Sequence, residues 1–413
     1  MSGGSVRIAV IGGGAAGLMA AGRAGENGAC VTLYEKNRSF GRKLAITGKG
    51  RCNVTNDCDA DEFIKNITKN GRFLYTAANR FTSADTKAFF ESRGVPLKTE
   101  RGNRVFPRSD KAADIVGALS GYAEEHIRKA VRERVLSIDK TGGVFTVATE
   151  RGKESFDRVI VATGGVSYPA TGSTGDGYAF AEHFGHSIET PVPSLVPLTV
   201  KGGFSGTLQG LTLKNVGLKV FDEDAGKTVY EDFGEALFTH FGFSGPIILS
   251  ASAHMREKHR YTLVFDLKPA LDVQTLDRRL QRDFSEKPAK TFHVYLRELM
   301  PSSLAAAFAG YCGIGQERTL NSITRAERYS IINDLKAYRF GVTGFRPIAE
   351  AIVTSGGVPV SELFPKTMES RLCPGLYFAG EVIDCDAYTG GFNLQTAFST
   401  AVLAADAASG MIG

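Results

Sequence analysis

Short apolar runs that end at glycines recur along this chain and predict the buried strands of a parallel sheet. The run from Val6 to Ile11 passes directly into a glycine turn and then into an Ala- and Leu-rich stretch, which has helical spacing to about Asn27. A second run, from Cys30 to Tyr34, ends at Glu35. The order strand, glycine turn, helix, strand and acid predicts a βαβ unit at the start of the chain.

The pattern changes twice further along the chain. Two more candidates for buried strands, Val159 to Ala162 and Gly375 to Ala379, lie far apart in the sequence. Between them, from about Pro191 to Asp266, apolar and polar residues alternate between Gly, Asp and Asn turns, which predicts antiparallel strands. From about Leu271 to Leu335 the apolar positions have helical spacing and predict a small helical section.

Composition and charge exclude several classes of protein. The chain has 413 residues, of which 43% are hydrophobic and 23% charged, so we expect a globular protein with either one large core and an insertion or two to three domains. Its net charge of +5 is too small to require a nucleic-acid partner. We expect a cytoplasmic protein without membrane contact, because no apolar run reaches the roughly 18 residues of a membrane span and no signal-peptide pattern is present. The six cysteines show no zinc-type spacing, so we expect reduced thiols and no metal.

The first glycine turn has the spacing of a dinucleotide-binding motif, Gly12-x-Gly14-x-x-Gly17. Gly12 permits the tight turn, Gly14 lets the backbone approach a pyrophosphate, and Gly17 permits close packing of helix on strand. Glu35 lies 18 residues beyond Gly17, near the separation of about 20 expected of the acid that binds a ribose 2′-hydroxyl. Because an acid there disfavours a 2′-phosphate, the predicted ligand is FAD or NAD.

The segment from Lys36 to Arg51 contains a cluster of basic residues and no acidic residue. Its members are Lys36, Arg38, Arg42, Lys43, Lys49 and Arg51. We expect this basic cluster to face an anion, although a solvated surface run is the alternative.

Two further patterns do not support other chemistry. Gly48-Lys49 resembles the end of a Walker motif, but Lys43 stands where that motif needs a glycine, so ATP hydrolysis is not expected. His183 and His186 have helical i, i+3 spacing without a third ligand, which favours surface or capping roles over a metal site.

Four further segments have residue patterns that are too specific to be explained as ordinary surface loops. They are Gly41 to Asn56, Ser167 to Gly177, Gly234 to Pro246, and Thr354 to Gly357 continued through Gly380-Glu381 to Gly390-Gly-Phe-Asn-Leu-Gln395. In the spacing and order of these segments the sequence resembles, nearly from end to end, the bacterial BaiN/YhiN-like family of FAD-dependent oxidoreductases. It departs from the expected pattern after Asp384, where Asp386-Ala387-Tyr388 replaces an Asp-Gly turn and puts the contacts there in doubt.

The resemblance implies an α/β fold with a Rossmann-like, two-part FAD-binding domain formed by residues 1–190 and 349–413. This domain would be interrupted by an antiparallel β-rich domain, residues 191–270 and 336–348, and by a small helical domain, residues 271–335. The changes of pattern along the chain agree with this organisation.

The resemblance also implies how FAD is held. The Ala162-Thr163-Gly164 turn would close on FAD, Glu381 would accept hydrogen bonds from the ribityl chain, and a helix beginning near Gly391 would direct its N–H groups at the flavin N1/C2=O edge. The basic cluster would then lie beside the pyrophosphate. The full set of expected FAD-binding residues is Gly12, Gly14, Ala16, Gly17, Glu35, Lys36, Arg42, Lys43, Gly50, Arg51, Cys52, Asn53, Val135, Ala162, Thr163, Gly164, Gly380, Glu381, Gly391, Asn393 and Leu394.

Hydride chemistry on a flavin also needs a group that supplies or removes a proton. The candidates are His240, Cys52, Tyr168 and Tyr388. A thiol or imidazole titrates nearest neutral pH, so we favour His240 and then Cys52. For His240, a structural role as a core histidine is as good an interpretation as a catalytic role. For Cys52, packing in the FAD loop is a somewhat better interpretation than catalysis.

From the resemblance we predict an NAD(P)H-driven, FAD-dependent oxidoreductase that reduces a C=C bond conjugated to a carbonyl, in a steroid-like or other small enone. The alternatives are a ribosomal RNA dihydrouridine synthase, a flavin amine oxidase and a non-enzymatic flavin-binding protein. The RNA alternative would use the basic segments Lys98 to Arg108 and Arg128 to Arg134.

Overall fold

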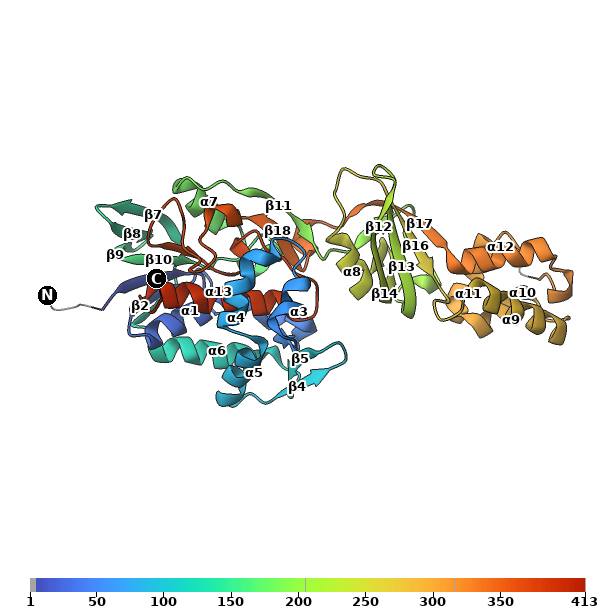
Figure 1. The fold of residues 1–413 in the computed structure, drawn as a ribbon, viewed down its shortest axis with the longest axis horizontal. Coiled ribbons are helices and arrows are strands. Elements are labelled where there is room, and N and C mark those ends of the chain that lie inside the picture. Colours follow the sequence, from blue (N-terminus) through green and yellow to red (C-terminus); the bar gives the residue numbers. More distant parts are fainter. Residues whose placement is uncertain (1–4, 205, 316, 413) are drawn as a thin grey trace. The chain divides into compact units, whose positions relative to one another are not determined.

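The computed structural model describes residues 5–204, 206–315 and 317–412. The chain folds into two compact units, whose helices and strands are labelled in Figure 1. The first unit joins Met1–Ser194 to Pro347–Gly413, and the second consists of Leu195–Arg346. The two ends of the chain therefore build one unit together, and the middle of the chain builds the other.

A parallel sheet of five strands, in the order β19-β10-β1-β2-β6, forms the centre of the first unit (Figure 1). Its strands are β1 (Arg7–Ile11), β2 (Cys30–Tyr34), β6 (Lys129–Val131), β10 (Arg158–Val161) and β19 (Leu376–Phe378). After their first residues β1 and β10 are wholly apolar and buried, as expected of strands with both faces of the sheet covered. The four apolar runs of the sequence thus form four of the five strands.

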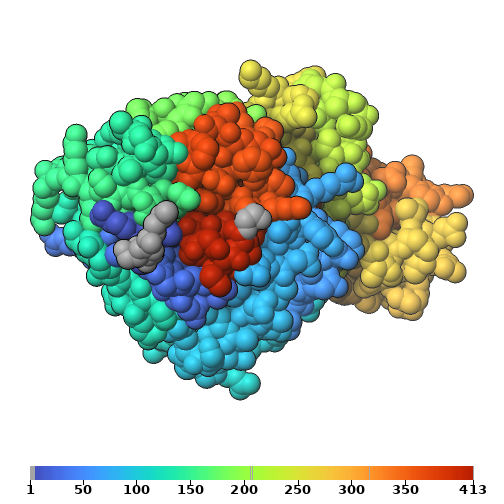
Figure 2. Space-filling model, turned by 60° about the vertical axis from the view of Figure 1, so that its left-hand side comes forward, coloured from blue at the N-terminus to red at the C-terminus, as the bar shows by residue number. Residues whose placement is uncertain are grey.

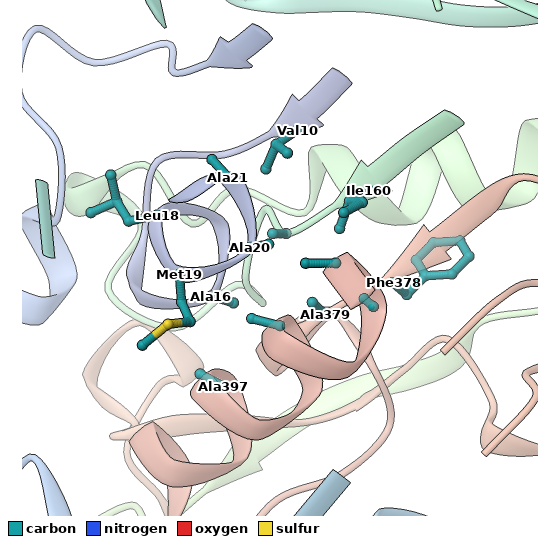
Figure 3. Packing of buried hydrophobic residues seen from close by; sticks show 14 of the residues in the cluster. Val10, Ala16, Leu18, Met19, Ala20, Ala21, Ile160, Phe378, Ala379 and Ala397 are labelled. Atoms are coloured by element: carbon teal, nitrogen blue, oxygen red, sulfur yellow. The ribbon is translucent and has the colours of Figure 1, made fainter. Parts of the chain in front are cut away.

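Two helices from opposite ends of the chain pack against each other and against this sheet. They are α1 (Ala15–Glu26) and α13 (Phe392–Ala408). Figure 3 shows that small side chains, among them Ala16, Ala20 and Ala397, lie where the two helices meet. Figure 2 shows the same relation from outside, with the red C-terminal atoms between the blue and green atoms of the N-terminal segment. The N-terminal segment therefore shares its core with the C-terminal one.

Smaller elements complete the first unit. The helices are α2 (Arg42–Ile46), α3 (Ala60–Lys65), α4 (Tyr75–Arg80), α5 (Ser83–Ser92), α6 (Ala112–His126) and α7 (Asp176–His183). The strands are β3 (Thr55–Asn56), β4 (Leu97–Glu100) and β5 (Arg104–Pro107) in one sheet, β7 (Val135–Thr141), β8 (Val144–Thr149) and β9 (Gly152–Phe156) in another, and the pair β11 (Glu189–Ser194) and β18 (Val353–Gly357).

The second unit contains a closed barrel with the strand order β12-β15-β14-β13-β16-β17. Its strands are β12 (Leu198–Val200), β13 (Thr212–Asp222), β14 (Lys227–Thr239), β15 (Gly242–Ser244), β16 (Tyr261–Asp266) and β17 (Tyr338–Phe345). Its helices are α8 (Pro246–Ser252), α9 (Val273–Glu286), α10 (Phe292–Leu299), α11 (Ser302–Tyr311) and α12 (Arg325–Lys336). Buried residues alternate with more exposed ones along β16, and aromatic rings such as Phe243 and Phe265 pack inside the barrel.

The observed elements confirm the predicted fold class, a Rossmann-type α/β fold with an antiparallel section and a helical section. The barrel and the helices α9 to α12 belong to the same compact unit, and the three domain boundaries given above stay predictions. In the part of the chain that the structure describes, no helix is both long and apolar enough to cross a membrane.

Candidate functional site

The carboxyl ends of the parallel strands gather the predicted site at one edge of the sheet. β1, β10 and β19 are neighbours with parallel direction, and each continues into a glycine-containing turn. The backbone links these turns to the next strand, since Ala162 N–H donates to the carbonyl of Ile11 at 2.8 Å and Ala379 N–H to that of Val161 at 3.0 Å. In open α/β sheets this edge is where ligands bind.

The turn after β1 is closely packed on one side and open on the other. Gly12 has φ 105°, and a Cβ there would lie 2.5 Å from the carbonyl oxygen of Ala162. A Cβ on Gly17 would lie 1.7 Å from the carbonyl oxygen of Gly12. A Cβ on Gly14, by contrast, would meet no atom within 4 Å. Gly14 is also the N-cap of α1 and makes no side-chain cap, so the first N–H groups of this helix face a space that a phosphate could fill.

Glu35 is buried at the rim of this turn, with 8% of its surface exposed. One carboxylate oxygen accepts a hydrogen bond from Gly13 N–H at 2.8 Å, and the other accepts two from Asn37 at 2.7 Å. A carboxylate has about four acceptor positions, so these three donors leave one for a ribose hydroxyl. The structure therefore holds Glu35 in a fixed orientation beside the open space at Gly14.

The turn after β19 carries Glu381, which lies in the short helix η8 (Gly380–Val382). Its carboxylate accepts hydrogen bonds from the ammonium group of Lys43 at 2.6 and 2.9 Å, from the hydroxyl of Ser167 at 3.0 Å and from the N–H of Thr354 at 2.9 Å. Sequence reasoning missed Ser167 and Thr354 as partners of this carboxylate. The signal that could have found them is that both belong to the segments that carry the family resemblance.

The N-terminus of α13 lies beside β3. Gly391 caps the helix with φ 102°, and a Cβ there would lie 2.3 Å from the carbonyl carbon and oxygen of Thr55. Asn393 does not cap the helix, because its side-chain amide bonds the backbone of Ala387 instead. The amide oxygen accepts from the N–H of Ala387 at 3.0 Å, and the amide nitrogen donates to the carbonyl of Ala387 at 2.8 Å. The first N–H groups of α13 thus have no side-chain cap, which leaves them available to a ligand.

Most members of the basic cluster are paired with carboxylates or amides of the protein. Lys36 contacts Asp176 at 2.8 Å, and Arg42 contacts the side-chain oxygen of Asn37 at 2.8 Å. Arg51 contacts Asp110 at 2.6 Å and also pairs with Glu100. Lys43 pairs with Glu381. The sequence predicted an anion for this cluster, and the anions that the structure provides are side chains from distant segments. Contacts of Lys36, Arg42 and Arg51 with FAD stay predictions.

Two buried polar atoms in the predicted cofactor segments have no hydrogen-bond partner in the described structure. They are Oδ1 of Asn53, after the basic cluster, and Oγ1 of Thr163, in the turn after β10. Buried polar atoms are normally satisfied, so each such atom calls for a partner that the described residues do not supply. The open space at Gly14, at the start of α1, fits a phosphate-bearing ligand such as FAD.

The candidate proton donors differ in environment. Cys52 is fully buried with φ 60°, and burial raises the pKa of its thiol to about 12 although Thr47 provides a hydrogen bond. Tyr168 and Tyr388 are partly exposed, in the turn before η3 (Pro169–Thr171) and before α13. These three lie in the first unit, whereas His240 is exposed at the turn between β14 and β15 of the second unit.

The other predicted residues lie within the first unit. Val135 is buried at the start of β7, Ala16 is buried in α1, and Leu394 is partly buried in α13. Gly50 is exposed in the loop that follows α2, with φ 83°. Their contacts with FAD stay predictions.

The expectation of a surface or capping role is wrong for His186. It lies beyond the end of α7 and is only 4% exposed. Its ring nitrogens contact Glu362 at 2.8 Å and the Ser370 hydroxyl at 2.7 Å. Ser370 already accepts bonds from two backbone N–H groups, so its hydroxyl proton points to His186. His186 is therefore a core residue whose ring links Glu362 to Ser370.

The segment that departs from the family pattern is a buried acidic loop. Asp384 contacts Lys69 at 2.8 Å and the N–H of Gly356 at 3.0 Å. Asp386 accepts hydrogen bonds from Ser194 at 2.7 Å and from Thr68 at 2.9 Å. The loop is thus held by partners that a sequence-local turn motif does not reveal.

The family model described as HI0933-like protein Rossmann domain matches residues 6–407 of the chain. The 3-dehydro-bile acid delta(4,6)-reductase of Clostridium scindens is 31% identical over 420 residues, covering 98% of this chain and 99% of that protein. The ribosomal RNA dihydrouridine synthase of Escherichia coli is 31% identical over 396 residues, covering 95% of each chain.

Solved structures show the same architecture. A 3-ketosteroid delta1-dehydrogenase from Sterolibacterium denitrificans superposes with a TM-score of 0.53 at 13% sequence identity. The superposition covers 99% of this chain and 100% of the dehydrogenase chain. The open conformation of a flavocytochrome c3 fumarate reductase gives a TM-score of 0.52 at 18% identity, covering 98% of this chain and 78% of that one. At these identities the likeness establishes the fold.

Proposed function

The chain belongs to the HI0933-like Rossmann family and has the FAD-binding fold of flavoprotein oxidoreductases, and from that premise we propose that it reduces a C=C bond conjugated to a carbonyl group. The observation that carries FAD binding is the open space at Gly14 with Glu35 fixed at its rim. The reaction class is supported by the reductase of Clostridium scindens, which aligns with nearly the whole chain.

The proposed reaction adds a hydride and a proton across the double bond. When bound, FAD would supply the hydride to the carbon β to the carbonyl, with NAD(P)H as the proposed reductant. The proton goes to the α carbon and must come from the protein or from water. Cys52 is a poor source, because its buried thiol has a pKa of about 12 and no access to solvent from which to regain the proton. We therefore propose His240, which is exposed, ahead of Cys52.

We propose a small, steroid-like enone as the substrate. Part of the positive charge in the basic segments that an RNA substrate would need is paired within the protein. Lys98 contacts Asp110 at 2.7 Å, and Arg134 contacts Asp176 at 2.8 Å. Arg128 likewise pairs with Glu154. These pairs leave a smaller electrostatic footprint for a phosphate backbone than the sequence suggests.

A ribosomal RNA substrate is the second candidate, because two relatives named ribosomal RNA dihydrouridine synthase are 31% and 30% identical and cover 95% of this chain. Uracil and an enone would be reduced in the same way, because the 5,6 double bond of uracil is also conjugated to a carbonyl. In both, the hydride goes to the carbon β to the carbonyl and the proton goes to the α carbon. The two candidates therefore differ in what surrounds the double bond.

The test starts from the purified protein, which is expected to be yellow with one FAD per chain and to bleach anaerobically with NADH or NADPH. Incubation with unsaturated 3-keto steroids should then consume the reduced nicotinamide. In parallel, a strain without the gene is analysed for dihydrouridine in ribosomal RNA. Loss of dihydrouridine would replace the small molecule by RNA, and flavin that no nicotinamide reduces would favour a non-enzymatic flavin protein. Turnover of amines alone would favour an amine oxidase.

Replacing Glu35 by Ala should weaken FAD binding by roughly 1.5–3 kcal/mol, because a charge-assisted hydrogen bond to the ribose is lost. Titration of apoprotein with FAD measures the change. Glu35→Gln serves as the control, since it keeps the size of the side chain and one acceptor oxygen and should lose less. Unchanged affinity in Glu35→Ala would show that this carboxylate does not bind the ribose.

A further inference from the structure

Lys43 and Glu381 form an ion pair at the centre of four chain segments. Lys43 lies in α2, and Glu381 lies in η8, 338 positions further along the chain. Ser167 follows the turn after β10, and Thr354 lies in β18. Because the segments are so distant in sequence, the folded unit brings them to one carboxylate.

We propose that Lys43 is a positioning residue for FAD, which holds the Glu381 carboxylate so that one of its oxygens can accept a hydroxyl of the ribityl chain. This inference rests on the proposed binding of FAD. It differs from the role expected of Lys43 from the sequence, which was a direct contact with FAD.

The three protons of the Lys43 ammonium group are already used. The ammonium nitrogen lies 2.6 Å from the Ser167 hydroxyl and 2.9 and 2.6 Å from the two carboxylate oxygens of Glu381. A lysine ammonium has three donors and no acceptor. No donor therefore remains for a phosphate while this arrangement is kept.

The acceptor positions of Glu381 identify which oxygen is free. Oε1 accepts from Lys43, from the Ser167 hydroxyl at 3.0 Å and from the Thr354 N–H at 2.9 Å. Oε2 accepts from Lys43 at 2.6 Å and from no other described residue. Oε1 thus has three donors and Oε2 has one, so a further hydroxyl group is most readily accepted by Oε2. The Glu381 side chain is 21% exposed.

The surroundings fix the carboxylate as a rigid acceptor. The hydroxyl oxygen of Thr354 accepts hydrogen bonds from the N–H groups of Val166 at 2.9 Å and Ser167 at 3.1 Å. A Cβ on Gly165 would lie 2.4 Å from that hydroxyl oxygen and 3.1 Å from Oε1 of Glu381. The turn after β10 is thus pressed against Oε1, and Lys43 is the one described partner that orients Oε2.

Lys43→Met tests the proposal, and Lys49→Met is its matched control. Both variants remove one positive charge from the basic cluster, but Lys49 is exposed and has no ion pair among the described residues. Apoprotein of each variant is titrated with FAD, and its unfolding midpoint is measured without FAD. Lys43→Met is expected to weaken FAD binding about 10- to 100-fold, and also to lower the midpoint, because the pair is mostly buried. Lys49→Met should weaken FAD binding much less, because it removes a charge of the basic cluster but no partner of Glu381.

A double-variant cycle shows whether Lys43 acts through Glu381. Glu381→Gln alone should weaken FAD binding by a similar factor, and adding Lys43→Met to it should weaken binding little further. Fully additive losses would mean that Lys43 contacts FAD directly, and equal losses in Lys43→Met and Lys49→Met would mean a general effect of charge. Either result overturns the proposal, as does wild-type affinity in Lys43→Met.

A substitute variant and the wild-type measurement cover the remaining outcomes. If Lys43→Met does not fold, Lys43→Arg replaces it in the same cycle, because a guanidinium keeps the charge but cannot place one nitrogen between both oxygens. It is expected to weaken FAD binding in the wild-type background and not in the Glu381→Gln background. A wild-type protein that binds no FAD refutes the proposed function itself, which is a different result from a wild type that binds FAD equally well without Lys43.

Discussion

Replacing Asp406 by Asn is expected to lower the free energy of unfolding by about 3 kcal/mol. Asp406 lies in the last turn of α13 with no exposed side-chain surface. Its carboxylate accepts hydrogen bonds from Arg23 at 2.7 Å, Asn27 at 2.8 Å and Arg80 at 2.8 Å. The C-terminal end of a helix disfavours a negative charge, so these donors stabilise it. The amide keeps the size of the side chain but leaves two guanidinium groups without their carboxylate, and urea denaturation measures the loss.

The same carboxylate should make the protein sensitive to acid. Burial opposes its ionisation, but the hydrogen bonds from Arg23, Asn27 and Arg80 outweigh burial and hold the pKa of Asp406 below its usual value. A carboxyl whose pKa is lower in the folded state contributes stability that is present above the unfolded pKa of about 3.9 and is lost as pH falls through the folded pKa. The difference between wild type and Asp406→Asn should therefore be constant near neutral pH and shrink below about pH 4.

An exposed ion pair supplies the control for this prediction. Lys65 and Glu62 are 3.4 Å apart, with 72% and 54% of their side-chain surfaces exposed. Lys65→Met should change the free energy of unfolding by less than about 0.5 kcal/mol. A loss in Asp406→Asn as small as this one, or a difference independent of pH, would contradict the role assigned to the buried carboxylate.

Four strands of the parallel sheet could be predicted because each is a short, mainly apolar run, and three of these runs lead into a glycine turn. The run from Cys30 to Tyr34 coincides with β2, and the run from Val6 to Ile11 differs from β1 by one residue. Burial on both faces leaves little choice of residue type in such strands. The edge strand β6 was not predicted, since its Lys129 and Ala130 are exposed and give no apolar run.

The partners of the charged residues could not be predicted from local pattern. Arg23 and Asp406 are 383 positions apart, and nothing near either of them in the sequence marks the pair. The segment from Lys36 to Arg51 contains no acidic residue, yet Asp176 and Glu381 meet it in the folded unit. Local sequence records the sign of a charge, and only the fold decides which counter-charge lies beside it.

His186 shows the same limit for a polar residue. Its spacing from His183 indicated a helix surface, but α7 ends at His183 and the chain turns inward. Glu362 and Ser370, which satisfy its two ring nitrogens, lie 176 and 184 positions away. A buried histidine is tolerated only where such partners exist, and they cannot be recognised before the strands are placed.

Gly14→Ala is expected to leave the apoprotein as stable as the wild type and to weaken FAD binding about 10- to 100-fold. Gly14 has φ −83° and ψ −167°, which any residue adopts, and a Cβ there meets no atom within 4 Å. The added methyl group therefore disturbs nothing in the protein. It would occupy the space through which a pyrophosphate approaches the backbone at the start of α1. Titration with FAD and the unfolding midpoint of the apoprotein separate the two effects.

Gly17→Ala is the matched variant in the same turn, with the opposite expected result. Its Cβ would lie 1.7 Å from the carbonyl oxygen of Gly12, so α1 would have to move away from β1. We expect this variant to lower the free energy of unfolding by about 2 kcal/mol or more, even without FAD. If Gly14→Ala binds FAD as tightly as the wild type, the space at Gly14 is not the pyrophosphate site. If Gly14→Ala instead loses stability as Gly17→Ala does, the turn is packed on both sides, and its glycines serve the fold rather than a ligand.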